Sequence, residues 1–135
     1  MEKEFVTYDL ALRMKALGFN EHCFAIFDCD THKLIQNILC QVENTCTNEA
    51  LGTASDVVWI TAPTWQSAFE WFEEKYNIDS FIEKIFKDEY GYTITSGGNE
   101  PINRFDLDTK KEAQQACLEK LCEIVEKKKE DGGKL

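Results

Sequence analysis

The residue types most capable of chemistry in this sequence stand together in one short segment: Asp28, Cys29, Asp30, Thr31 and His32. Carboxylate, thiolate and imidazole groups all bind metal ions, but neighbouring residues cannot easily surround one ion without help from elsewhere. His22 would lie across a hairpin from this segment. Asp and Thr also favour turns, because their side chains bond the local backbone. The segment is therefore predicted to be a solvated β-turn, with a metal site as the alternative.

The same segment resembles the first motif of haloacid-dehalogenase-type phosphatases, in which an apolar strand ends in two aspartates separated by one residue. That resemblance implies Asp28 as the nucleophile and Asp30 as the general acid and base. It implies a magnesium ion held through few carboxylates and water. Thr61 would imitate the second motif, and Asp106 with Asp108 has the spacing of the later acidic pair. The family also has a parallel sheet with crossover helices.

The six cysteines predict free, buried thiols, not a disulfide framework or a zinc site. They are Cys23, Cys29, Cys40, Cys46, Cys117 and Cys122, and no two of them form a C-x-x-C pair. Cys117 and Cys122 would lie about 140° apart around a helix, too far for one metal. The charged start of the sequence does not read as a signal peptide, so we expect a reducing cytoplasm in which thiols persist.

Charge and hydropathy narrow the partner classes. The chain has 135 residues and a net charge of −10, from 25 acidic and 15 basic residues, and no basic stripe. This charge repels phosphate groups, so we expect no direct binding to nucleic acid and no attraction to anionic lipid. No apolar run approaches the roughly 20 residues that a membrane span needs. The sequence predicts a soluble protein whose partner, if charged, is basic.

Hydrophobic periodicity predicts the elements that position these residues. In the first half we expect a helix capped by Thr7 and ended by Gly18, strands at 23–27, 34–40 and 57–60, and a surface loop over 43–56. In the second half, helices start at Pro63 and at the capping box of Thr109 with Glu112. Residues 80–86 fit a short helix or a hairpin arm pairing with 90–95, and strand is favoured; 102–107 adds a further strand.

These elements predict an α+β fold. The expected order is α-β-β-β-α-β-β(-β)-α, with an antiparallel or mixed sheet packed by three amphipathic helices. A length of 135 residues favours a single domain over 1–135, in which residues 130–135 form a frayed tail.

One aromatic residue is a candidate contact for a partner. Trp71 lies away from the centre of the apolar face of its helix, beside Glu70 and Glu74. Tryptophan is enriched at the residues that dominate protein interfaces. The alternative is that Trp71 closes the edge of a wide core face.

Three stretches of the sequence together resemble a family of small proteins from gut Bacteroidales and their phages: residues 8–19 with 23–25, 62–76, and 112–121. They cover about half of the chain, and the middle stretch is the most specific. The resemblance implies an accessory protein of a phage or mobile element that acts in the bacterial cytoplasm. It implies no activity and no catalytic residue.

The sequence therefore favours a non-enzymatic interaction protein that binds a host or phage protein, with no cofactor. Negative charge without a catalytic constellation motivates this hypothesis. A magnesium-dependent phosphatase using Asp28 and Asp30 is the enzymatic alternative. A sponge for a small signalling molecule is the third, and it would need a deep pocket.

Overall fold

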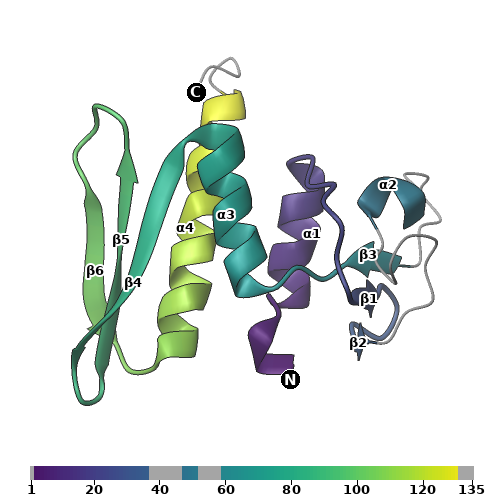
Figure 1. The fold of residues 1–135 in the computed structure, drawn as a ribbon, viewed down its shortest axis with the longest axis horizontal. Coiled ribbons are helices and arrows are strands. Elements are labelled where there is room, and N and C mark those ends of the chain that lie inside the picture. Colours follow the sequence, from purple (N-terminus) through teal and green to yellow (C-terminus); the bar gives the residue numbers. More distant parts are fainter. Residues whose placement is uncertain (1, 37–46, 52–58, 131–135) are drawn as a thin grey trace. The chain divides into compact units, whose positions relative to one another are not determined.

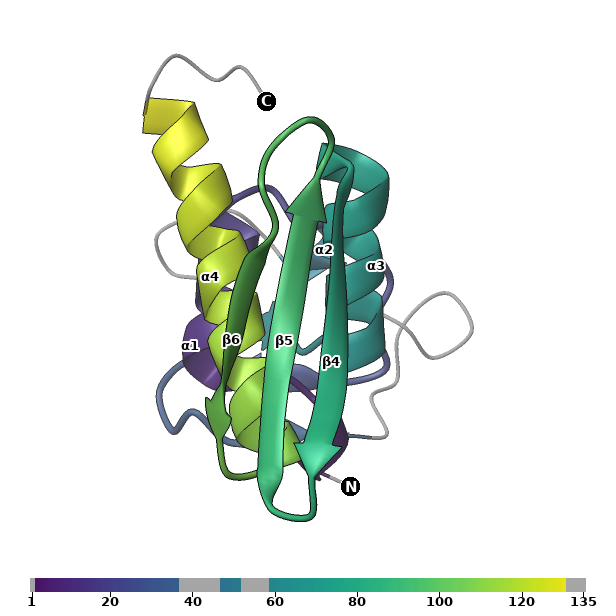
Figure 2. The ribbon, with the colours of Figure 1, turned by 90° about the vertical axis from the view of Figure 1, so that its left-hand side faces the viewer.

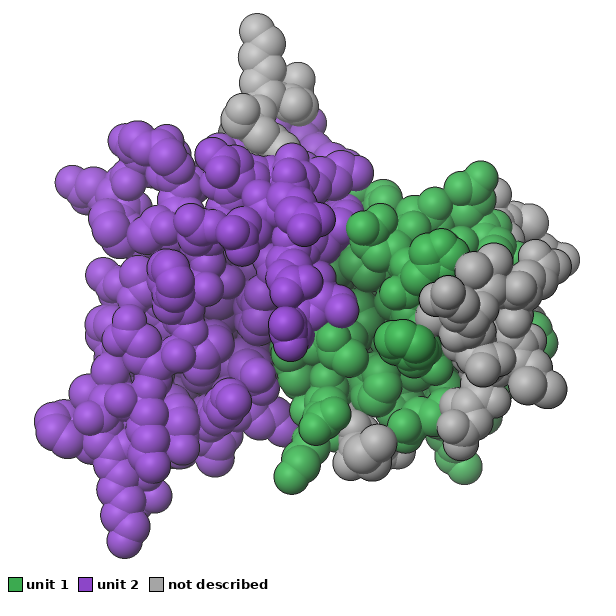
Figure 3. Space-filling view, viewed as in Figure 1, with its two compact units in different colours: residues 1–65 green, residues 66–135 purple. Residues whose placement is uncertain are grey.

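The computed structural model describes residues 2–36, 47–51 and 59–130. The chain divides into two compact units, residues 1–65 and residues 66–135, which Figure 3 colours separately. Each unit is built on its own three-stranded antiparallel sheet. The α+β class is confirmed. The expectation of one sheet under three helices is wrong, because strands from the two halves of the chain do not pair with each other in the described residues.

In its described residues, unit 1 combines its sheet, in the order β2-β1-β3, with two α-helices and a short 3-10 helix (Figure 1). The elements are η1 (Glu2–Glu4), α1 (Tyr8–Ala16), β1 (Ile26–Asp28), β2 (Leu34–Ile35), α2 (Asn48–Leu51) and β3 (Trp59–Thr61). The helix α1 follows its local signals. Thr7 caps it by accepting a hydrogen bond from the Leu10 N–H, and Gly18 follows its end with a φ of 97°.

The strands of unit 1 are shorter than the sequence predicts. β1 begins at Ile26, three residues later than expected, and β2 contains only Leu34 and Ile35. The rest of the predicted returning strand, and residues 57–58 of the third strand, lie outside the described residues. The predicted loop over 43–56 is wrong at Asn48–Leu51, which is helical.

The helix α2 forms because its first side chain is anchored in the protein. Asn48 is buried; its amide donates to the Phe19 carbonyl over 2.9 Å and its oxygen accepts from the Thr61 N–H over 2.9 Å. Asn48 thus satisfies backbone groups from two separate parts of unit 1. Next to it, Asn20 and Glu49 exchange two hydrogen bonds at the exposed surface.

Unit 2 is an antiparallel meander, β4-β5-β6, with both of its helices on one face of the sheet (Figures 1 and 2). Its elements are α3 (Trp65–Tyr76, whose first residue belongs to unit 1), β4 (Ile78–Phe86), β5 (Glu89–Ser96), β6 (Ile102–Leu107) and α4 (Lys110–Glu130). The helix α4 contacts all three strands. No helix of the described residues is long and apolar enough to cross a membrane.

Residues 80–86 belong to a strand, as favoured from the sequence. α3 ends at Tyr76, and Asn77 turns the chain with a φ of 56°, a left-handed conformation that asparagine tolerates. β4 then pairs with β5 from Ile78 opposite Ser96 to Phe86 opposite Glu89. The register shifts once, between Lys84 and Phe86. This extended pairing stabilises the strand more than a single capping box could stabilise a short helix.

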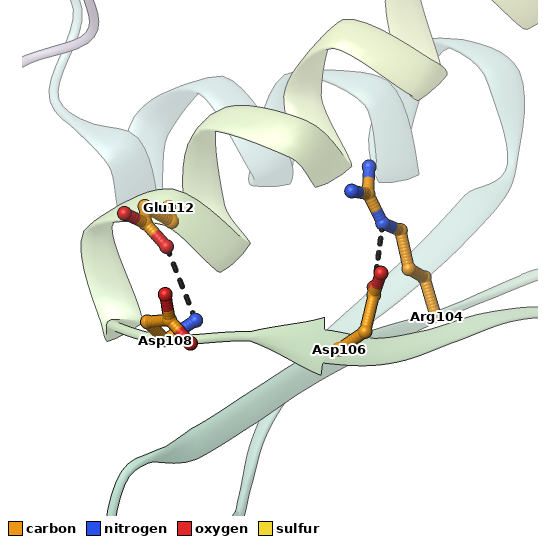
Figure 4. A network of polar contacts seen from close by, with 4 residues as sticks. All are labelled: Arg104, Asp106, Asp108 and Glu112. Carbon is orange, nitrogen blue, oxygen red and sulfur yellow. Dashed lines mark hydrogen bonds and ion pairs between the residues drawn. The ribbon is translucent and has the colours of Figure 1, made fainter.

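The beginning of α4 confirms the capping signal. The Glu112 N–H donates to Thr109 Oγ1 over 3.1 Å, which satisfies one of the donors that a helix N-terminus leaves free. The Glu112 carboxylate accepts from the Asp108 N–H over 3.1 Å, which ties the first turn of α4 to the residue that precedes the cap (Figure 4). α4 continues to Glu130, so the first residue of the predicted frayed tail is helical; residues 131–135 lie outside the described residues.

The sheet of unit 2 needs a glycine at its centre. A Cβ built on Gly91 would lie 2.2 Å from Phe105 Cδ1, 2.3 Å from the Arg104 carbonyl oxygen and 2.7 Å from Phe105 Cα. Two of these atoms are backbone, so they cannot rotate away. The register of β5 with β6 shifts here, between Tyr90 and Tyr92, and the ring of Phe105 covers the space that a side chain would occupy.

We predict that Gly91→Ala lowers the free energy of unfolding of unit 2 by about 1–3 kcal/mol, the usual cost of overpacking. The matched control is Gly97→Ala, whose Cβ would meet nothing nearer than Asn77 Nδ2 at 4.0 Å. Urea unfolding measured by circular dichroism compares the two. Because the clash involves backbone atoms, adding Phe105→Ala should not restore Gly91→Ala; full restoration would contradict this reading.

We predict that Asn48→Ala destabilises unit 1 by about 2–4 kcal/mol, because a buried carbonyl and a buried N–H both lose their partner. Asn20→Ala removes bonds of similar number at an exposed site and should cost less than about 1 kcal/mol. Hydrogen exchange at the Thr61 amide gives a local measurement. Equal losses for the two variants would show that Asn48 is not an anchor.

Candidate functional site

The segment from Asp28 to His32 forms the turn between β1 and β2, as predicted. The Asp28 carboxylate accepts hydrogen bonds from the N–H groups of Asp30 at 2.8 Å and Thr31 at 3.3 Å. The His32 N–H donates to the Asp28 carbonyl over 2.7 Å, and His32 adopts a left-handed φ of 61°. Asp28 therefore holds the turn with its side chain and its main chain together.

The setting of this turn differs from the one that the phosphatase resemblance implies. β1 pairs antiparallel with both β2 and β3, whereas that resemblance requires parallel strands. Thr61 is in β3 and fully buried. Asp106 and Asp108 belong to unit 2, where Asp106 forms an ion pair with Arg104 at 2.8 Å and the Asp108 N–H bonds Glu112 (Figure 4). Thus Thr61 is buried, and the carboxylate of Asp106 already has a partner in unit 2.

Aromatic stacking joins the turn to α1. The rings of Tyr8 and His32 are stacked with centroids 3.8 Å apart, and Phe27 meets Tyr8 edge-on at 5.7 Å. Burial raises the pKa of Tyr8, and its hydrogen bond with the Cys29 thiol raises this pKa further. These contacts fix the turn against the helix. Within residues 2–36, 47–51 and 59–130, no three His, Cys, Asp or Glu side chains gather to hold a metal ion.

The described thiols are reduced and differ in exposure. Cys23, Cys117 and Cys122 are buried, whereas Cys29 is half-buried in the turn. Burial raises the pKa of Cys23 to about 12, and the nearby Thr61 hydroxyl only partly offsets it. Burial likewise raises the pKa of Cys117 to about 12, against a smaller lowering by Ser80. Neither thiol supplies thiolate near neutral pH. Cys40 and Cys46 lie outside the described residues.

The helix α3 does not present Trp71 to a partner. Trp71 has only 6% of its surface exposed and packs edge-on against Phe72 and Tyr76. The Lys75 ammonium lies 5.3 Å from the Trp71 ring centroid. This burial agrees with the alternative, in which Trp71 closes the edge of a core face. Glu70 and Glu74 are exposed beside it.

Two exposed aromatic side chains of unit 2, Phe81 and Phe105, lie on the face of its sheet away from the helices. Side chains alternate along a strand. Ser80 of β4 is close enough to Cys117 of α4 to lower the pKa of that thiol, so the residues next to Ser80 in β4 point away from the helix. We call the opposite side the outer face; it consists of Asp79, Phe81, Glu83, Gly91, Thr93, Thr95, Asn103 and Phe105. Figure 2 views the sheet from this side.

Strand register orders the outer face in rows. Phe81 pairs with Thr93, which pairs with Asn103 and donates a hydrogen bond to its side chain over 2.8 Å. The next row holds Glu83 opposite Gly91, over which the ring of Phe105 lies. Phe81 is 55% exposed and Phe105 is 38% exposed. The sequence analysis did not identify these residues as a site. The sequence of β4 does carry a signal, because apolar residues occur on both of its faces: Ile78 and Ile82 on one, Phe81 and Ile85 on the other.

An open acidic recess adjoins the outer face at the end of the β4–β5 hairpin. It measures about 500 Å³ and is lined by Phe86, Lys87, Asp88, Glu89, Asp106, Leu107 and Asp108. Phe86 is 68% exposed there. Four carboxylates against one lysine make this end of the sheet negative. The recess is open to solvent, whereas a site for a small ligand is usually enclosed and buries most of the ligand.

We predict that iodoacetamide at neutral pH alkylates Cys29 at least tenfold faster than Cys23 or Cys117 in the folded protein, because alkylation requires an accessible thiolate. Peptide mapping by mass spectrometry reads each site separately. Labelling in urea is the control, since unfolding should make the three rates similar. Comparable rates in the folded protein would contradict the burial of Cys23 and Cys117.

Comparison with other proteins assigns no function to these residues. Comparison of the chain with family models, with curated proteins and with solved structures finds no match. The resemblance to proteins of Bacteroidales and their phages, and the phosphatase resemblance of residues 28–31, therefore stay predictions from the sequence.

Proposed function

We propose that the protein is a non-enzymatic interaction protein that binds another protein through the outer face of the unit 2 sheet. The observation that supports this most is the exposure of Phe81 and Phe105 on adjacent rows of one uncovered sheet face. Single exposed apolar residues are common on protein surfaces, but rings gathered on one face are typical of interaction sites.

The chemistry of the face suits a protein partner better than a small molecule. It is a sheet face formed by three paired strands, and it combines aromatic rings with Thr93, Thr95 and Asn103. Large aromatic anchors surrounded by polar groups are the usual composition of the centre of a protein interface. A sponge for a small molecule would need a deeper, more enclosed site.

The turn at Asp28 gives less support to an enzyme. Its carboxylate already accepts two backbone hydrogen bonds, and its strand has antiparallel neighbours.

The resemblance to proteins of Bacteroidales and their phages adds a biological setting to the proposal. In that setting the protein is an accessory protein of a phage or mobile element, and it acts in the bacterial cytoplasm on a host or phage protein.

The decisive experiment compares two exposed phenylalanines. Immobilised wild-type protein, Phe81→Ser and Phe24→Ser are incubated with the same lysate of a Bacteroidales host, and the retained proteins are quantified by mass spectrometry. Phe24 is 65% exposed in unit 1, so it is matched to Phe81 in type and exposure. We predict that the wild type and Phe24→Ser retain the same specific partner in similar amounts. Phe81→Ser should retain about tenfold less of it, the effect expected when a residue that dominates an interface is lost.

Circular dichroism and thermal unfolding must show that both variants keep the wild-type fold, which their exposed positions favour. Retention of the same proteins in the same amounts by the wild type and Phe81→Ser would exclude the outer face as the binding site. A partner lost equally with Phe24→Ser would exclude it as well.

A further inference from the structure

The charged groups of the outer face have one sign. Asp79 and Glu83 share this face with Phe81, and no lysine or arginine occurs among its residues as defined above. The nearby bases are directed elsewhere. The Lys84 ammonium lies 5.9 Å from the Tyr90 ring centroid, and Arg104 pairs with Asp106 at 2.8 Å. A partner thus meets aromatic rings bordered by carboxylates without a resident cation.

The position of Glu83 relative to the rings is set by the missing side chain of Gly91. Glu83 of β4 pairs with Gly91 of β5, and the ring of Phe105, from β6, lies over that glycine. The ring therefore covers part of β5, the strand next to Glu83. Phe81 is two residues before Glu83 and on the same face. Glu83 therefore shares the outer face with Phe81, two positions away along β4, and with Phe105, whose ring covers the residue that pairs with Glu83.

This juxtaposition suits a guanidinium group. Arginine is planar, stacks on aromatic faces and donates paired hydrogen bonds to a carboxylate, so one side chain can use the ring and the acid together. Resting on the function proposed above, we propose that the partner presents a basic, arginine-containing segment to the outer face, with an arginine at Glu83 between Phe81 and Phe105.

Charge also separates this partner from other occupants. A second copy of the chain would bring the same two carboxylates onto the face, and each copy has a net charge of −10. Nucleic acid and anionic membranes would be repelled in the same way. At the hairpin end, Asp88 and Glu89 in the acidic recess extend the negative surface in the direction of the β4 strand. A basic polypeptide is the occupant that this distribution favours.

The test uses three short extended peptides as probes: Ac-Arg-Leu-Arg-Leu-Arg-NH₂, the same peptide with lysine for arginine, and the same with glutamate for arginine. Each is titrated into the full-length ¹⁵N-labelled protein at low salt, and amide chemical shifts give the site and the Kd. We expect the arginine peptide to bind most tightly, the glutamate peptide not to bind, and the shifts to centre on Phe81, Glu83, Gly91 and Phe105.

Two charge-neutralising variants locate the interaction. Glu83→Gln should raise the Kd of the arginine peptide about two- to fivefold, the range for one exposed ion pair. Glu74→Gln removes an exposed carboxylate from α3 and should leave the Kd unchanged. Added salt should reduce the difference between the wild type and Glu83→Gln.

The inference fails if the glutamate peptide binds as well as the arginine peptide, if Glu83→Gln has no effect, or if Glu74→Gln has the larger effect. Self-association of the free protein through the same amides would assign the face to a second copy instead. A failure of the peptide experiment does not contradict the proposed function if Phe81→Ser still retains less of the lysate partner than the wild type. Conversely, if the arginine peptide binds as expected but Phe81→Ser retains the lysate partner fully, only the proposed function is contradicted.

Discussion

A three-stranded sheet has two faces, and unit 2 has helices for only one of them. Both α3 and α4 lie on the same side of β4, β5 and β6, and α4 contacts all three strands. The residues of the sheet therefore divide sharply. Ile78, Tyr92 and Ile94 are buried, whereas Phe81 and Phe105 are exposed on the other side. The proposed binding surface is a direct consequence of this one-sided cover.

Unit 1 uses its reactive residue types for its own structure. The Asp28 carboxylate closes the β1–β2 turn, His32 stacks on Tyr8, and Asn48 satisfies a carbonyl and an N–H from different segments. Such short strands bury little apolar surface, so side-chain hydrogen bonds and ring stacking contribute to holding them in place. Asp28 and His32, two of the residues that look catalytic in the sequence, thus take part in the structure of unit 1.

Local signals predicted the fold better than the site. Thr7, Gly18, Thr109 and Glu112 act within one helical turn, and the structure confirms each. Division into two sheets was not predicted, because strand pairing joins residues distant in sequence. Trp71 illustrates the same limit, since its exposure depends on neighbours that helical periodicity does not include. The sequence of β4 did indicate the outer face, because apolar residues occur on both faces of that strand. Only the strand pairing shows which of the two faces the helices cover.

The width of the sheet limits how any partner binds. Three strands about 4.8 Å apart, the shortest of which has 6 residues, present roughly 10 Å by 20 Å, or about 200 Å², over the length that they share. A stable interface buries about 800 Å² on each partner. The outer face alone covers about a quarter of that footprint. A partner bound there must either make further contacts beyond the edges of the sheet or dissociate rapidly.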